Sequence, residues 1–211
     1  ARDPTATVFR RNAKAMLEAA NLECIRWDRT LFSDLSFSLN SGELLRVAGT
    51  NGSGKTSLLR ILCGLLSPAH GEVRWRDSNI RSLREEYWRE IVYLGHSSAI
   101  KDELTAAENL VVACTLAGIK IGRDQAMAAL HCFGLADCAE LPAKVLSQGQ
   151  RRRVSLARLI LSEKLPLWIL DEPFTALDAA AVDYMQTLIA EHIARGATVV
   201  LTTHQEARIA S

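Results

Sequence analysis

The stretch Gly49-Thr50-Asn51-Gly52-Ser53-Gly54-Lys55-Thr56-Ser57 decides the fold of this chain. It matches the pattern G-x-x-x-x-G-K-[ST], in which glycines let successive backbone N–H groups approach phosphate oxygens. The apolar run at 44–48 before it predicts a buried strand, and 56–62 after it predicts a helix whose N-terminus favours anions. The alternative is an ordinary glycine-rich turn. In this context the pattern favours a phosphate-binding loop, called the P-loop below.

We therefore expect the P-loop to hold the phosphates of a nucleotide. Lys55 is assigned to the β- and γ-phosphates, and Thr56 to Mg²⁺. The residues expected to contact the nucleotide here are Gly49, Asn51, Gly52, Ser53, Gly54, Lys55, Thr56 and Ser57.

Two carboxylates follow the apolar run at 167–170. Phosphoryl transfer needs a metal ion held opposite the P-loop and a group that orients the attacking water. Asp171, at the carboxyl end of a predicted strand, suits the metal site, and Glu172 is the candidate base. The alternative is a strand that simply ends in two acidic turn residues.

The composition suits one domain with a substantial core, since the 211 residues are 48% hydrophobic. A formal net charge of +1 argues against a nucleic-acid partner. The run Arg151-Arg152-Arg153 is expected to be a solvated helix face. Five scattered cysteines without a C-x-x-C pair suit a reducing compartment. His131, Cys132 and Cys138 lie close in sequence, but buried structural thiols are favoured over a zinc site.

The order of predicted elements indicates a parallel sheet with an insertion. We expect residues 1–15 to be a disordered leader or tag, followed by strand-like segments up to residue 48. No apolar run reaches the roughly 18 residues that a membrane span needs. Helices dominate from His96 to Leu146, opened by a capping box between Thr105 and Glu108. Apolar strands that alternate with helices predict a parallel sheet covered on both faces.

Further motifs then identify a family. Leu146-Ser147-Gln148-Gly149-Gln150 resembles the signature motif of ABC-type ATPases, with Gln148 in its third place. Thr175-Ala176-Leu177-Asp178 resembles their D-loop, and His204 their switch histidine. The motifs follow the order of that family and cover nearly the whole chain from Met16. The resemblance implies an α/β fold: a P-loop NTPase core, an antiparallel β layer of ABC type and an inserted helical subdomain at about 97–160, all in one ABC ATPase domain at 16–211.

The resemblance also implies a second copy of the chain as a partner. In such ATPases two copies sandwich ATP, so the phosphates at Lys55 of one copy would meet Ser147 and Gly149 of the other. The site residues carried over in this way are Ser147, Gln148, Gly149, Gln150 and Asp178. His204 would contact the γ-phosphate and help to hold Glu172 and water in line.

Two positions depart from the family pattern. The residue after the strand at 91–94 and Gly95 is usually glutamine, and here it is His96. Imidazole suits Mg²⁺ less well than an amide oxygen, so we expect His96 to act in catalysis through hydrogen bonds and loop coupling. Trp27 lies near the place of an aromatic residue that stacks on adenine, and stacking and packing roles both stay open.

Four stretches resemble the ATP-binding subunit of the cytochrome c maturation, or heme export, transporter: Tyr93-Leu94-Gly95-His96, the signature with the residues up to Val154, the run from Trp168 to Asp178, and Thr202-Thr203-His204-Gln205. That similarity implies a peripheral place on the cytoplasmic face of the inner membrane, bound to integral permease subunits. No C-x-x-C-H motif occurs, so no heme ligation by this chain is expected. The alternatives are a soluble scaffold ABC ATPase of the iron–sulfur assembly type and the ATPase subunit of another exporter.

Overall fold

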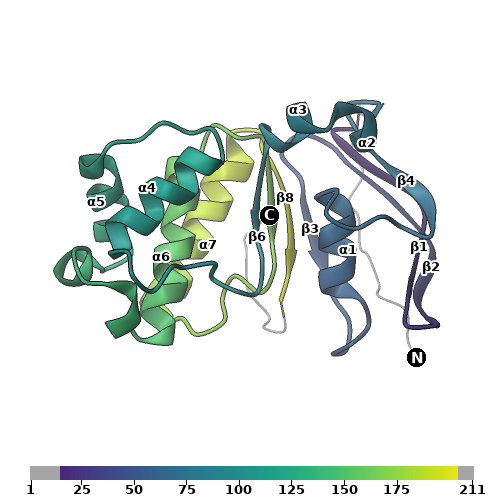
Figure 1. Cartoon of the computed structure of the whole chain (residues 1–211). Helices are drawn as coiled ribbons and strands as arrows, with labels where there is room; N and C mark the ends of the chain where they lie inside the picture. Colours follow the sequence, from purple (N-terminus) through teal and green to yellow (C-terminus); the bar gives the residue numbers. More distant parts are fainter. Residues whose placement is uncertain (1–14, 204–211) are drawn as a thin grey trace. The chain divides into compact units, whose positions relative to one another are not determined.

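The structure is a computed structural model that describes residues 15–203 (Figure 1). The expectations for residues 1–14 and for His204 lie outside these residues. The described chain divides into two compact units: the first comprises 15–95, 165–172 and 191–203, and the second comprises 96–164 and 173–190.

One sheet of the first unit is antiparallel, with strand order β2-β1-β4-β5. Its strands are β1 (Leu17–Arg26), β2 (Arg29–Leu39), β4 (His70–Trp75) and β5 (Ser78–Asn79). Trp27 and Asp28 join β1 to β2, and both have positive φ, at 51° and 58°. Positive φ at both positions is typical of the two-residue hairpin turns that match strand twist.

The other sheet of the first unit is parallel, as predicted, with strand order β3-β8-β7-β6. Its strands are β3 (Leu44–Val47), β6 (Ile91–Leu94), β7 (Leu167–Leu170) and β8 (Thr198–Thr202). Every residue of β7 and β8 is buried, because a central parallel strand is covered on both faces. The β3 strand leads into the P-loop, and β7 leads into Asp171.

Helix α1 (Lys55–Leu62) lies between the two sheets of the first unit (Figure 1). Its apolar side chains join a core formed with both sheets; among its members are Leu17, Leu39, Leu59, Ile169 and Val200. The helix-compatible run at 82–88 does not form one helix, because two short helices are present there, α2 (Ile80–Leu83) and α3 (Glu85–Trp88). They are separated at Arg84, whose φ of 47° no continuous right-handed helix can contain.

The second unit is helical. Three of its helices pack against one another (Figure 1): α4 (Ala106–Leu116), α5 (Arg123–Cys132) and α6 (Gln148–Leu161). The unit also contains two short 3₁₀ turns, η1 (Ala136–Cys138) and η2 (Ala143–Val145), and most of α7 (Ala179–Ala194). The predicted capping box is present: Thr105 Oγ1 accepts from Glu108 N–H and a Glu108 carboxylate oxygen accepts from Thr105 N–H. Phe133 and Tyr184 meet edge to face, with ring centroids 5.1 Å apart.

Of the two cysteines for which a buried thiol was favoured over a zinc site, Cys138 is buried and Cys132 is not. Cys24, Cys63, Cys114 and Cys138 are buried free thiols, whereas Cys132 is exposed at the end of α5. Within residues 15–203 no cluster of three or more metal-ligating side chains occurs. In the same range no helix has both the length and the apolar composition required to cross a membrane.

Candidate active site

The P-loop ends in an uncapped helix start. Gly54 precedes α1 with φ 98°, no side chain caps the helix, and its first turn contains no acidic residue. A Cβ on Gly54 would lie 3.1 Å from Leu31 Cβ and 3.1 Å from Phe32 Cδ1. Only glycine combines the left-handed conformation with this close approach of β2. The N–H groups of the first turn are consequently left to an anion.

Lys55 lies over the loop that precedes it. Its side chain is buried, and Nζ donates to the carbonyl oxygens of Gly49 at 2.7 Å and Thr50 at 3.1 Å. A phosphate oxygen is charged and forms a stronger hydrogen bond to an ammonium group than a neutral carbonyl does. The cation is therefore placed where a phosphate in the P-loop would outcompete the present acceptors.

Asp171 joins three elements of the first unit. It is 1% exposed, and its Oδ2 accepts from Thr56 Oγ1 at 2.8 Å while its Oδ1 accepts from Thr202 Oγ1 at 2.7 Å. Its N–H donates to Leu94 O at 2.8 Å. A hydroxyl at the start of α1, a carboxylate after β7 and a hydroxyl at the end of β8 thus meet at the carboxyl edge of the parallel sheet.

Thr202 is a site residue that the sequence reasoning missed. Besides its bond to Asp171, its Oγ1 accepts from Glu172 N–H at 2.9 Å. Glu172 is half-buried and has φ 52°, so this bond fixes the turn that carries the candidate base. The available signal was a threonine at the carboxyl end of an apolar strand, because such ends gather at one edge of a parallel sheet.

The donor atoms at this edge fit Mg²⁺. Thr56 and Asp171 offer a hydroxyl and a carboxylate oxygen, the ligand types that a hard cation prefers. The nearby Cys63 thiol does not compete, because burial and the charge of Asp171 raise its pKa well above the usual value and keep it protonated. A soft metal would require the thiolate.

In the second unit, the predicted signature forms the start of α6. Ser147 is the N-cap: its Oγ accepts from Gln150 N–H at 3.2 Å, and Gln150 Oε1 accepts from Ser147 N–H at 2.8 Å. A Cβ on Gly149 would lie 2.9 Å from Ala176 O. Glycine is needed here because the predicted D-loop approaches the helix start closely.

Asp178 fixes the other end of that D-loop. Its Oδ1 accepts from Ala181 N–H at 2.8 Å, and its carboxylate lies 3.7 Å from Arg153 Nη1. Arg153 lies in α6, so the D-loop is tied to the signature helix by charge as well as by packing.

The expectation of a solvated arginine face at 151–153 is wrong. Arg152 is 5% exposed, Arg151 pairs with Asp102 at 2.6 Å, and Arg153 pairs with Asp178. The three guanidinium groups contact Asp102, the carbonyl oxygen of His96 and Asp178, all of which belong to the second unit.

His96 is exposed, and its carbonyl oxygen accepts from Arg152 Nη1 at 3.5 Å. It borders a cavity of about 470 Å³ with Ser97, Ser98, Ala99, Ile100, Gln148 and Arg151. The structure therefore brings His96 to the predicted signature within the second unit.

Trp27 is 97% exposed in the turn between β1 and β2, which excludes the packing role. Stacking on adenine stays a prediction.

The described site residues thus fall into two groups. The P-loop, Asp171, Glu172 and Thr202 lie together in the first unit, and His96, the predicted signature and Asp178 lie together in the second.

Comparison with known proteins identifies the family of this chain. The family model described as ABC transporter matches residues 32–175. The chain belongs to the ABC transporter family. Three similar proteins carry the name cytochrome c biogenesis ATP-binding export protein CcmA. That of Nitrosomonas europaea is 57% identical, with 90% of this chain and 89% of the relative covered; that of Nitrosospira multiformis is 55% identical, with 92% and 94% covered; and that of Yersinia pseudotuberculosis is 49% identical, with 90% and 87% covered.

Solved structures agree in fold. An ATP-binding subunit of an ABC transporter is 27% identical and superposes with a TM-score of 0.79, covering 90% of this chain and 79% of that one. A dimeric ATP-binding cassette in a post-hydrolysis state, bound to ADP and Pi, has a TM-score of 0.80 at 24% identity, covers 92% and 91%, and shows the fold alone. The predicted family, the α/β fold with its P-loop core and the assignment as an ATPase are confirmed.

Proposed function

We propose that this chain is the ATP-hydrolysing subunit of an export transporter for cytochrome c biogenesis, with heme as the predicted cargo. Support comes from relatives of that name that are 47–57% identical and match most of both chains. The soluble iron–sulfur scaffold and a subunit of an unrelated exporter are not favoured, because these relatives carry an export name linked to cytochrome c.

The observation that carries the ATP-hydrolysing part of the proposal is the Thr56–Asp171–Thr202 cluster beside the P-loop. In this proposal Lys55 and the uncapped N–H groups of α1 bind the β- and γ-phosphates of ATP. Thr56 and Asp171 hold Mg²⁺, which when bound neutralises charge on the phosphates. Thr202 keeps both Asp171 and the following turn in place.

Glu172 orients the attacking water in this mechanism. Its N–H donates to Thr202 Oγ1, and this bond fixes the backbone of the turn that carries the half-buried side chain. His204 contacts the γ-phosphate and helps to align Glu172 and water. His96 acts through hydrogen bonds and through the loop that it begins.

The second half of each ATP site comes from a second copy of the chain. Ser147, Gln148, Gly149 and Gln150 present the start of α6 to ATP bound at Lys55 of the other copy, and Asp178 shapes the adjoining loop. Supporting this, the first turn of α6 has no acidic residue, so its dipole favours an incoming phosphate. Hydrolysis then requires ATP-dependent dimerisation.

We further propose one ABC ATPase domain at 16–211, with the helical subdomain at about 97–160 inserted in it. It acts on the cytoplasmic face of the inner membrane, bound peripherally to integral permease subunits. The balanced charge and the lack of a C-x-x-C-H motif support a role without nucleic acid and without heme ligation by this chain.

The test is Mg·ATP hydrolysis by the purified chain. Specific activity should rise with protein concentration, because each site needs a second copy. Lys55→Ala should weaken ATP binding by about 10- to 100-fold, as expected when a charged hydrogen-bond partner is lost. Lys164→Ala, which removes an exposed lysine outside the site, should bind normally. Specific activity that is independent of concentration, or equal loss in both variants, would contradict the proposal.

A further inference from the structure

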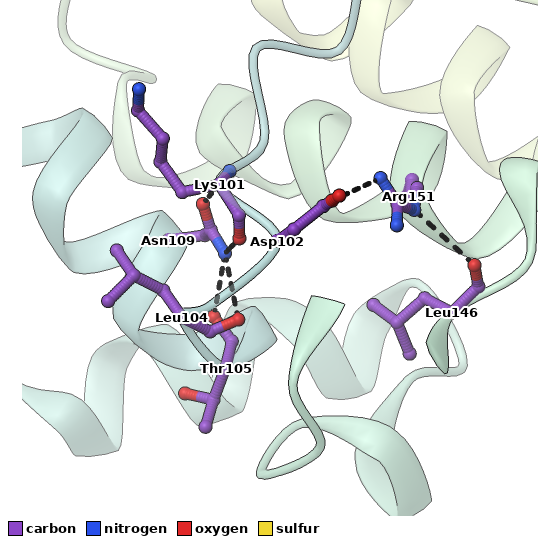
Figure 2. A network of polar contacts seen from close by, with 7 residues as sticks. All are labelled: Lys101, Asp102, Leu104, Thr105, Asn109, Leu146 and Arg151. Atoms are coloured by element: carbon purple, nitrogen blue, oxygen red, sulfur yellow. Dashed lines mark hydrogen bonds and ion pairs between the residues drawn. The ribbon is translucent and has the colours of Figure 1, made fainter. Parts of the chain in front are cut away.

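Arg151 links the start of α6 to the loop that precedes α4. Its Nη1 lies 2.6 Å from Asp102 Oδ1, and its Nε donates to Leu146 O at 3.4 Å (Figure 2). Leu146 immediately precedes the N-cap Ser147. One planar guanidinium group therefore connects a carboxylate on the loop to the backbone at the entrance of the signature helix.

Asn109 makes the loop that carries Asp102 rigid. This buried side chain accepts from Lys101 N–H at 2.7 Å and donates to the carbonyl oxygens of Lys101, Leu104 and Thr105 (Figure 2). Both sides of one amide group are thus used on a single loop. Asp102 therefore lies between backbone groups that the Asn109 side chain holds, at Lys101 on one side and at Leu104 on the other.

The same loop runs beside the segment that leads into α6. Ala143 N–H donates to Leu104 O at 2.8 Å, and Lys144 N–H donates to Asp102 O at 3.1 Å. Residues 102–105 therefore run along 142–144, directly before Leu146. The two segments are therefore connected twice, by the ion pair between Asp102 and Arg151 and by these backbone hydrogen bonds.

The ion pair is not a device for overall stability. The Asp102 side chain is 55% exposed and that of Arg151 is 28% exposed, and exposed ion pairs add little to folding free energy. A cation in the first turn of a helix is also unfavourable for the helix dipole. An arginine at this position, opposite a clamped aspartate, therefore has a geometric role.

We infer that Asp102 and Arg151 are positioning residues for the signature. Their ion pair sets the orientation of the first turn of α6, and with it Ser147 and Gly149, relative to the loop that begins at His96. Movement of that loop, which borders the same cavity as Arg151, is passed to the signature through this pair. The inference rests on the proposed function, in which the signature meets ATP bound by a second copy.

The experiment uses the full chain with Glu172→Gln, so that hydrolysis does not disturb the measurement. Dimer formation is followed by sedimentation against ATP concentration, and nucleotide affinity is measured separately with a fluorescent ATP analogue. Asp102→Asn, Arg151→Gln and the double variant form a cycle. The charge swap Asp102→Arg with Arg151→Asp tests rescue. Glu103→Gln is the matched control, since Glu103 is an exposed neighbouring carboxylate with no ion pair among the described residues.

We expect Asp102→Asn and Arg151→Gln each to weaken ATP-dependent dimerisation by about fivefold to tenfold, the range of coupled contacts. The double variant should be no worse than either single one, and the swap should recover most of the loss. Nucleotide affinity and the midpoint of thermal unfolding should not change. A purely structural role would lower that midpoint and leave dimerisation of the folded protein intact.

Equal behaviour of Asp102→Asn and Glu103→Gln, or additive losses without rescue, would overturn the inference alone. If the parent Glu172→Gln chain did not dimerise with ATP, the proposed function would fail, and the inference with it. Because the parent is measured first, the two failures are distinguishable.

Discussion

Two helix starts in this molecule, those of α1 and α6, are built in opposite ways for the same proposed ligand. At α1 the N-cap is a glycine with φ 98° and no side-chain cap. At α6 a serine and a glutamine form a closed capping box. The α1 start thus has no side-chain cap and packs closely against β2, whereas the α6 start has a side-chain cap and is connected to neighbouring loops by the ion pairs of Arg151 and Arg153. The difference suggests a permanent binding site in one unit and an adjustable contact in the other.

Glu172→Gln should have the largest effect, because it should abolish most hydrolysis while both helix starts still bind ATP. Loss of the candidate base should lower kcat by about 10²- to 10⁴-fold, the usual contribution of a general base. The uncharged isostere leaves both helix starts unchanged, so ATP should still bind and should trap a dimer. Single-turnover hydrolysis and sedimentation with ATP measure the two effects. Hydrolysis at the wild-type rate would show that Glu172 is not the base.

Acid should weaken the unit that carries α1. His192 is fully buried and stacks on Trp168 with ring centroids 3.6 Å apart. Burial, with the nearby charge of Arg195, lowers its pKa to about 4. The unfolded chain takes up this proton near pH 6.5 and the folded chain only near pH 4, so stability is retained above about 6.5 and falls between those values, by about 3 kcal/mol.

His192→Phe keeps a ring against Trp168 and removes this titration. The free energy of unfolding, measured with urea at pH values from about 4 to 7, should then depend less on pH. His131→Gln alters an exposed histidine of α5 and should leave the wild-type slope. A wild-type slope in His192→Phe would contradict the assignment.

Alanine at the two glycines should break the two helix starts separately. Gly54→Ala and Gly149→Ala should each cost about 1–3 kcal/mol, because the new Cβ meets atoms within 3.1 Å and 2.9 Å respectively. Gly54→Ala should lose ATP binding by a single copy. Gly149→Ala should bind ATP and fail to dimerise.

Gly118→Ala is the control for backbone strain, since Gly118 has φ 76° and nothing within 4 Å of its added Cβ. It should lose stability and keep both functions. Loss of ATP binding in Gly149→Ala would mean that the two helix starts do not act independently, and would contradict the assignment of ATP binding to α1 and of dimerisation to α6.

Ser147→Ala should have the smallest effect. Loss of an N-cap costs about 1 kcal/mol, and α6 has further contacts that hold it. ATP-dependent dimerisation should weaken by about fivefold, with ATP binding unchanged. Ser155→Ala, which removes a hydroxyl bonded to Arg152 O in the same helix, is the control. Equal dimerisation of both variants would indicate that the capping box is structural only.

Much of this architecture could be predicted from short stretches of sequence. The P-loop, the strand before Asp171 and the capping box at Thr105 could be predicted because each depends on residues adjacent in sequence. The helix break at Arg84 could not be predicted, since nothing in the helix-compatible run 82–88 indicates that one residue takes φ 47°.

Long-range contacts explain the other misses. Thr202 reaches Asp171 across 31 residues, and Arg151 reaches Asp102 across 49. A run of three arginines indicates a solvated helix face when its partners, Asp102 and Asp178, are distant in sequence and not recognisable from it.

The order of strands in the parallel sheet has a consequence for synthesis of the protein. Strand β3, which leads into the P-loop, pairs with β8, and β8 separates it from β7. Because β8 lies between β3 and β7, the part of the sheet that connects the P-loop strand to the Asp171 strand is completed only after β8 has been synthesised. Pairings so distant in sequence form slowly. A nascent chain that stops before Thr198 would carry the P-loop sequence without the strand that pairs with β3 among residues 15–203, so we expect it to hydrolyse ATP only once β8 has paired.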